Sequence, residues 1–117
     1  MVVITCERKQ DELWLRQLIE KRHLPARTAK AGEGWTLRIL ADGGVQSRDQ
    51  VITCGTDPRC SVTASSLLEG GMASLQREMR TLSGKTLQPQ EISMEGLPGT
   101  AEQKLTGAAV LLLLRQT

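Results

Sequence analysis

The hydrophobic and polar positions near the N-terminus change from a strand pattern to a helix pattern within a few residues. Residues 2–5 form a short β-branched run, and positions 11–25 follow with an amphipathic repeat that opens on two acids and closes at a proline. At 100° per residue, the repeat places four apolar side chains on one stripe, as a helix packed on a sheet requires. These residues are Trp14, Leu15, Leu18 and Ile19. Leu13 falls on the opposite side.

The middle of the chain alternates apolar and polar positions, which predicts strands. Within residues 35–42, the side chains of Trp35, Leu37 and Ile39, at every second position, lie on one face. The glycines at 43 and 44 then supply a turn, because glycine adopts positive φ at little cost. The chain next enters a second β-rich run at 51–54. The simplest interpretation is a hairpin made of these two runs.

Residues 59–82 fit two patterns. The first part, 59–65, alternates as a strand does, whereas 72–82 carries apolar residues at helical spacing. The pattern leaves strand and helix open here. A tight turn at 83–85 separates two further short runs, and Pro89 predicts that the second of these lies at a sheet edge.

The C-terminal segment predicts a buried helix. Thr100 and Gln103 have the spacing of a capping box, and residues 108–114 are apolar on every side. Such a helix must lie centrally or at a subunit contact. We therefore expect one α+β (or small α/β) domain over 1–117, in which a single layer of roughly four to five mixed strands packs against two to three helices.

Composition excludes some classes of function. Trp14 and Trp35 are the only aromatic residues, so the chain lacks the platform on which single-stranded nucleic acids stack. The net charge is +2, and the basic residues of 21–30 suit the end of a helix, which disfavours nucleic-acid binding. The N-terminus has no signal-peptide pattern and no apolar run could cross a bilayer, so we expect a cytoplasmic protein with no membrane contact.

The letters Val-Ile-Thr-Cys occur twice, at 3–6 and at 51–54. We interpret the repeat as a coincidence of strand composition, because no further units follow. Each copy nevertheless places a cysteine at the carboxyl end of a strand. If the two strands are parallel neighbours, these ends share the edge at which open α/β sheets bind ligands. Whether Cys6, Cys54 and Cys60 converge there is left open.

The loop after the second copy, 54–60, is the best candidate for a ligand site. It combines a glycine, hydroxyl groups and an arginine, and a helix beginning near Ala64 would aim free N–H groups at the same place. The alternative is that 56–58 is only a turn whose polar groups face solvent. The candidate ligand-binding residues are Cys6, Arg8, Cys54, Gly55, Thr56, Arg59 and Cys60.

The segments of this chain that resemble catalytic or metal-binding motifs do not have the residue spacing that those motifs require. The run at 84–86 lacks the upstream glycine of a phosphate-binding loop, and His23, the only histidine, suits a helix end. The cysteines are spaced poorly for zinc, and their odd number favours free thiols. We expect no catalytic residue, no metal and no cofactor.

The first functional hypothesis is a non-catalytic accessory or regulatory domain that binds a protein partner or forms a symmetric homodimer. The candidate partner-facing residues are Leu13, Leu24, Leu111 and Leu114. The alternative is an anion- or nucleotide-binding or thiol-dependent enzyme centred on 54–60.

Overall fold

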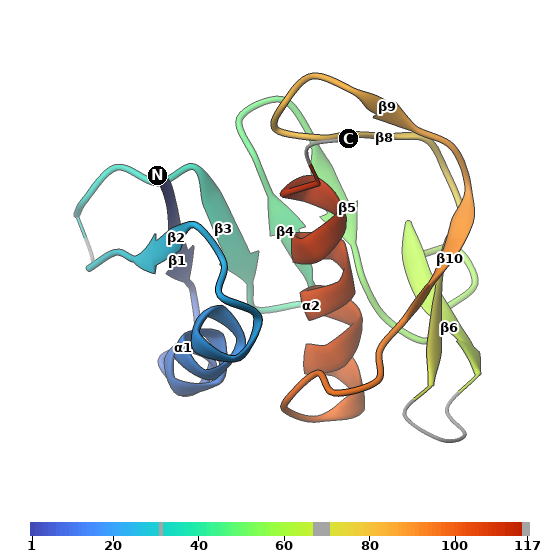
Figure 1. Ribbon diagram of the computed structural model, residues 1–117, viewed down its shortest axis with the longest axis horizontal. Coiled ribbons are helices and arrows are strands. Elements are labelled where there is room, and N and C mark those ends of the chain that lie inside the picture. Colours follow the sequence, from blue (N-terminus) through green and yellow to red (C-terminus); the bar gives the residue numbers. More distant parts are fainter. Residues whose placement is uncertain (31, 67–70, 116–117) are drawn as a thin grey trace.

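The computed structural model describes residues 1–30, 32–66 and 71–115 as an α+β fold (Figure 1). In this part of the chain, two helices, α1 (Gln10–Arg22) and α2 (Ala101–Leu113), pack with a five-stranded mixed sheet. The expected fold class is confirmed. Two smaller sheets, of three and two strands, add to the single layer that the sequence predicted.

The main sheet has the strand order β2-β1-β3-β4-β5. The strands are β1 (Val2–Cys6), β2 (Ala26–Thr28), β3 (Leu37–Leu40), β4 (Gly44–Gln46) and β5 (Val51–Thr53). β1 is parallel to β2 and β3, and β4 is antiparallel to β3 and β5. Therefore β1, β3 and β5 run in one direction and end at one edge. The two Val-Ile-Thr-Cys copies are parallel but not neighbours, because β3 and β4 lie between them.

The expected hairpin of 35–42 with 51–54 is wrong in one respect, since β3 pairs with β4 and not with β5. The pattern did not show β4, whose three residues include a single large apolar side chain. One face of the sheet is buried in the core with both helices. The buried apolar residues of its strands are Ile4, Ala26, Leu37, Ile39, Val45 and Ile52.

Helix α1 buries the predicted stripe, with Trp14, Leu15 and Leu18 buried and Ile19 packed at the border of the core. It ends earlier than expected because His23 adopts left-handed φ of 51°. The N–H of Leu24 then donates to the Ile19 carbonyl at 3.0 Å, which turns the chain back over the helix. Leu24 therefore packs against the core, and its expected outward position is wrong.

The described part of 59–82 contains strands joined by loops, and no helix. They contribute β6 (Val62–Ser66), β7 (Met72–Leu75) and β8 (Met79–Arg80), followed by β9 (Thr86–Leu87) and β10 (Gln90–Ser93). The helix start expected near Ala64 is wrong, because Ala64 lies inside β6 and pairs with β7. Positions 67–70 of this range, position 31 of the loop before β3, and 116–117 after α2 lie outside the described residues.

The two small sheets follow the turn signals of the sequence. β8 and β9 form an antiparallel hairpin across the turn predicted at 83–85. The three-stranded sheet has the order β10-β7-β6, so the run after Pro89 lies at an edge, as predicted.

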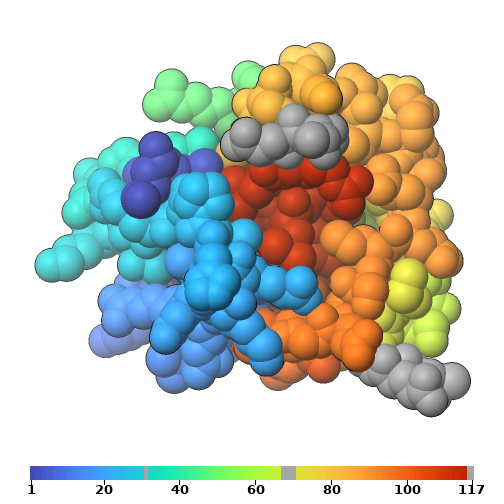
Figure 2. All heavy atoms as spheres, viewed as in Figure 1, coloured from blue at the N-terminus to red at the C-terminus, as the bar shows by residue number. Residues whose placement is uncertain are grey.

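Helix α2 occupies the centre of the molecule. The capping box is confirmed: the Gln103 N–H donates to Thr100 Oγ1 at 3.2 Å, and the Thr100 N–H donates to Gln103 Oε1 at 3.0 Å. α2 packs against α1, β4 and β6. On the face in Figure 2 it is visible only between α1 and the segment that precedes α2. No helix in the described ranges is long and apolar enough to cross a membrane.

The central position of α2 corrects two further expectations. Leu111 and Leu114 are partly buried and pack against the core, so they do not form a partner-facing surface. The chain itself covers the apolar helix, with α1 and two sheets around it. The reason for expecting a homodimer, a helix that so small a domain could not cover, therefore does not hold.

Candidate functional site

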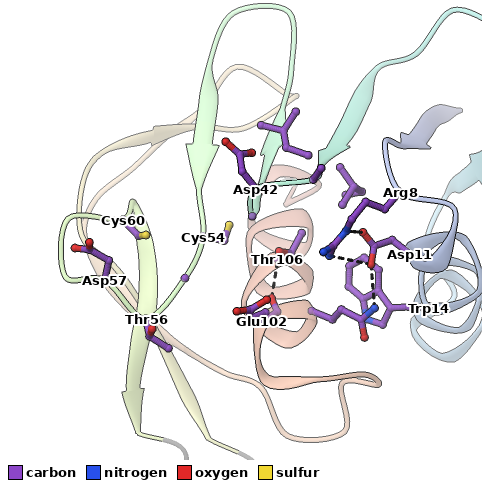
Figure 3. A pocket seen from close by; sticks show the side chains of 16 residues that line it. Arg8, Asp11, Trp14, Asp42, Cys54, Thr56, Asp57, Cys60, Glu102 and Thr106 are labelled. Carbon is purple, nitrogen blue, oxygen red and sulfur yellow. Dashed lines mark hydrogen bonds and ion pairs between the residues drawn. The ribbon is translucent and has the colours of Figure 1, made fainter.

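A cleft of about 320 Å³ opens where β1, β3 and β5 end (Figure 3). Arg8 follows β1, Asp42 follows β3, and residues 54–57 follow β5. The first turns of α1 and α2 complete the walls with Asp11 and Glu102. We call this feature the carboxyl-edge cleft.

A glycine at the turn between β3 and β4 allows the cleft to close on one side. Gly43 has φ of 92°, and a Cβ there would lie 2.7 Å from the Cys54 carbonyl oxygen. Only glycine permits both the backbone conformation and this approach. The Asp42 turn and the segment that follows β5 are thereby held side by side.

A buried carboxylate joins the two helices at the cleft. Asp11 is 1% exposed, and it accepts hydrogen bonds from Arg8 Nε at 3.0 Å and Arg8 Nη2 at 3.3 Å. Gln103 Nε2 donates to the same carboxylate at 3.0 Å, while Gln103 Oε1 accepts from Thr100 in the capping box. Hydrogen bonds thus hold both the nitrogen and the oxygen of the Gln103 amide, and Arg8 is already paired with Asp11.

The apolar wall of the cleft includes Trp14, whose indole N–H donates to the Pro98 carbonyl at 2.9 Å. The chain passes very close to this ring, since a Cβ on Gly99 would lie 2.5 Å from Trp14 Cδ1. The ring position is therefore fixed by a hydrogen bond and by backbone packing. Ile39 and Leu40 extend the apolar lining.

The three cysteines do not converge. Cys54 and Cys60 line the cleft, whereas Cys6 does not and belongs to β1, which β3 and β4 separate from β5 in the sheet. Burial raises the pKa of Cys54 to about 12, and burial followed by the charge of Asp11 raises the pKa of Cys6 to about 12. Both thiols are therefore protonated at neutral pH. Among the described residues, no three His, Cys, Asp or Glu side chains group as a metal site would require.

The loop 54–60 is arranged as a turn around Asp57. The Arg59 N–H donates to Asp57 Oδ1 at 2.8 Å, and the Arg59 guanidinium donates to the same carboxylate at 2.9 and 3.2 Å. These bonds lower the pKa of Asp57. The Arg59 side chain is 88% exposed and does not line the cleft. The Arg59 guanidinium is therefore already hydrogen-bonded within the turn.

Two of the features that predicted an anion site are thus absent from the described structure. Arg59 is paired with Asp57 outside the cleft, and no helix begins near Ala64. Of the seven candidate ligand-binding residues, five line the cleft and Cys6 and Arg59 do not. The five are Arg8, Cys54, Gly55, Thr56 and Cys60.

The acidic character of this edge was not predicted from the sequence. Among the described residues, the cleft is lined by the carboxylates of Asp11, Asp42, Asp57 and Glu102 and by the guanidinium of Arg8. Asp11 and Asp57 are paired as described, whereas the carboxylates of Asp42 and Glu102 accept no hydrogen bond and form no ion pair within 4 Å in the described structure. The pKa of Arg8 is nevertheless raised by its hydrogen bond to Asp11 and, to a smaller extent, by the charge of Glu102. The sequence shows the acids in the first turn of each helix, but it does not show that both helices begin at the same edge of the sheet.

No protein-family model, curated protein or solved structure matches this chain. Its function must therefore be inferred from the geometry and charge of the molecule itself.

Proposed function

We propose that the protein is a non-catalytic binding domain that holds a cationic side chain of a protein partner in the carboxyl-edge cleft. The observation that carries this proposal is the charge of the cleft, in which four carboxylates face one guanidinium. Arg8 neutralises Asp11, and Arg59 neutralises Asp57 from outside. Asp42 and Glu102 remain for a ligand.

The shape of the cleft supports a lysine or arginine side chain. Such a side chain has an apolar stem and a charged head. Trp14, Ile39 and Leu40 supply apolar wall for the stem, and Asp42 and Glu102 supply acceptors for the head. The volume of about 320 Å³ is at the lower end for ligand pockets, which suits one side chain better than a large cofactor.

The enzyme alternative has less support. A cysteine nucleophile reacts as the thiolate, and burial keeps Cys54 protonated at neutral pH, with a pKa of about 12. An anionic substrate would meet an excess of carboxylates in the cleft. A neutral thiol beside two unpartnered carboxylates suits binding of a cation.

Self-association also has less support than partner binding. Of the four candidate leucines only Leu13 is well exposed, at 66%. One side chain supplies far less than the area of roughly 800 Å² per partner that stable interfaces bury. The cysteines are free thiols, which suits a reducing compartment, so we propose a cytoplasmic location.

The test is calorimetric titration with short arginine-rich and glutamate-rich peptides. The basic peptide should bind, with an affinity that falls as salt rises. Removing both charges in D42N/E102Q should weaken its binding roughly tenfold or more, because hydrogen bonds to charged groups are lost. Glu91→Gln, the same change on the exposed strand β10, should have no effect.

Three results would contradict the proposal: no binding of the basic peptide, equal binding by D42N/E102Q, or preference for the acidic peptide. Sedimentation of the unliganded protein is the companion measurement. A stable dimer at micromolar concentration would restore self-association as the first function.

A further inference from the structure

A second recess, of about 530 Å³, lies at the opposite edge of the main sheet. Trp35 precedes β3, Arg48 and Asp49 precede β5, and the β8–β9 hairpin contributes Arg80 and Leu82. It shares no lining residue with the carboxyl-edge cleft. We call it the amino-edge recess.

The backbone of the amino-edge recess is held by one side chain. The Gln50 amide donates to the Arg80 carbonyl and accepts from the Arg80 N–H at 3.3 Å, as a neighbouring strand would. The Ser47 N–H in turn donates to the Gln50 carbonyl at 2.9 Å, which closes the turn that carries Arg48. The positions from which both arginines extend are therefore fixed relative to each other.

Both guanidinium groups are free to bind a ligand. Arg48 and Arg80 are exposed, and neither side chain has a hydrogen bond or ion pair within the part of the chain that the structure describes. Asp49 is the single carboxylate among the described lining residues. Two guanidinium groups and a single carboxylate favour binding of an anion here. A guanidinium donates paired hydrogen bonds to two oxygens of a phosphate or carboxylate.

An aromatic ring lies in the same recess. Trp35 is half-buried, and the guanidinium carbon of Arg38 lies 6.0 Å from its ring centroid. Arg38 is itself anchored to Glu7 at 2.6 Å, so the cation and the ring hold each other in place. The indole N–H of Trp35 has no acceptor among the described residues. A half-buried ring with an unused donor suits a flat ligand with polar edges.

We propose that the amino-edge recess binds a small anion, a phosphate or a carboxylate, carried on a flat ring. Arg48 and Arg80 hold the anionic group, and Trp35 and Leu82 contact the ring. This site is independent of the carboxyl-edge cleft and has the opposite charge preference.

Calorimetric titration with phenyl phosphate, benzoate and inorganic phosphate tests the proposal. Either ring compound should bind at one site, and comparison of the two distinguishes phosphate from carboxylate. Arg48→Gln and Arg80→Gln should each weaken binding roughly tenfold or more, since each removes a charge-assisted hydrogen bond. Arg16→Gln, on the exposed side of α1, is the matched control and should leave binding unchanged.

Trp35→Leu separates the ring contact from the charge contact. It should weaken binding of phenyl phosphate and leave binding of inorganic phosphate unchanged. The proposal is overturned if no probe binds at millimolar concentration, or if Arg48→Gln binds as the wild type does. Equal affinity for inorganic and phenyl phosphate would overturn the assignment of the ring contact. Arg48 lies on an exposed turn, so its variant tests the site even if Arg80→Gln does not fold.

Discussion

Replacing Asp11 by alanine should destabilise the protein by uncoupling its two helices. The carboxylate is 1% exposed and is the shared acceptor for Arg8 and Gln103. Alanine removes that acceptor and leaves Gln103 Nε2 without its partner at a half-buried contact between the helices. Arg8 is 37% exposed at its side chain, so its guanidinium can turn to water.

The magnitude follows from these two partners. A hydrogen bond to a charged group contributes about 1.5–3 kcal/mol, and we assign this to the Gln103 contact. The Arg8 pair is screened by solvent and adds little to this. Removing a buried charge also relieves part of its desolvation cost, which favours the lower half of the range. The expected loss is about 1.5–2 kcal/mol of unfolding free energy.

Urea denaturation followed by tryptophan fluorescence measures this loss. Glu12→Ala is the matched control, because Glu12 is also an acid in the first turn of α1 but its carboxylate accepts no hydrogen bond in the described structure. It should cost less than about 1 kcal/mol, the contribution of an acid to the helix dipole.

A double-mutant cycle of Asp11→Ala with Gln103→Ala isolates the contact between the helices. The two effects should fall short of additive by about 1 kcal/mol or more, since removing either partner already breaks the bond. The reasoning is refuted if Asp11→Ala costs no more than Glu12→Ala, or if the cycle shows no coupling.

Three further changes test the packing around the cleft, each by urea denaturation. Gly99→Ala should lower the free energy of unfolding by more than about 2 kcal/mol, because φ is +101° and the new Cβ would lie 2.5 Å from Trp14. Gly84→Ala is its control: with φ of +89° and no atom within 4 Å of the new Cβ, it should cost only about 1–2 kcal/mol. Equal losses for the two variants would contradict the argument from the Trp14 contact. Thr100→Ala should cost about 1 kcal/mol through loss of the cap, and no change would show that Gln103 alone holds the helix start. Burial raises the pKa values of Cys54 and Cys6 from 9.0 to about 12. Each thiol should therefore leave stability constant below pH 9 and lower it between pH 9 and 12, by about 4 kcal/mol at most for Cys54 and by less for Cys6, which is more exposed. Cys54→Ala should remove the Cys54 part of this alkaline slope, and a variant that keeps the full wild-type slope would contradict this.

Much of the local structure could be predicted from the sequence, because it depends on residues close together in the chain. The capping box of Thr100 and Gln103 joins residues three apart, and the turn at 83–85 joins adjacent strands. The stripe of α1 follows from helical periodicity alone, and it also placed Leu13 outside. The α+β class followed from the order of these elements.

The candidate site depended on contacts that no local pattern contains. Asp11 and Gln103 are 92 positions apart, and they meet only because both helices begin at the edge where β1, β3 and β5 end. β3 and β4 both lie between the two Val-Ile-Thr-Cys strands and keep Cys6 away from Cys54, although both copies have equal strand propensity. Burial of most of α2 was equally a tertiary outcome, because β6, which packs against it, comes from the range 59–82 that the pattern left open between strand and helix. Local sequence sets the preference of each segment, whereas the free energy gained by burying α2 decides which segments surround it and which charged groups come together.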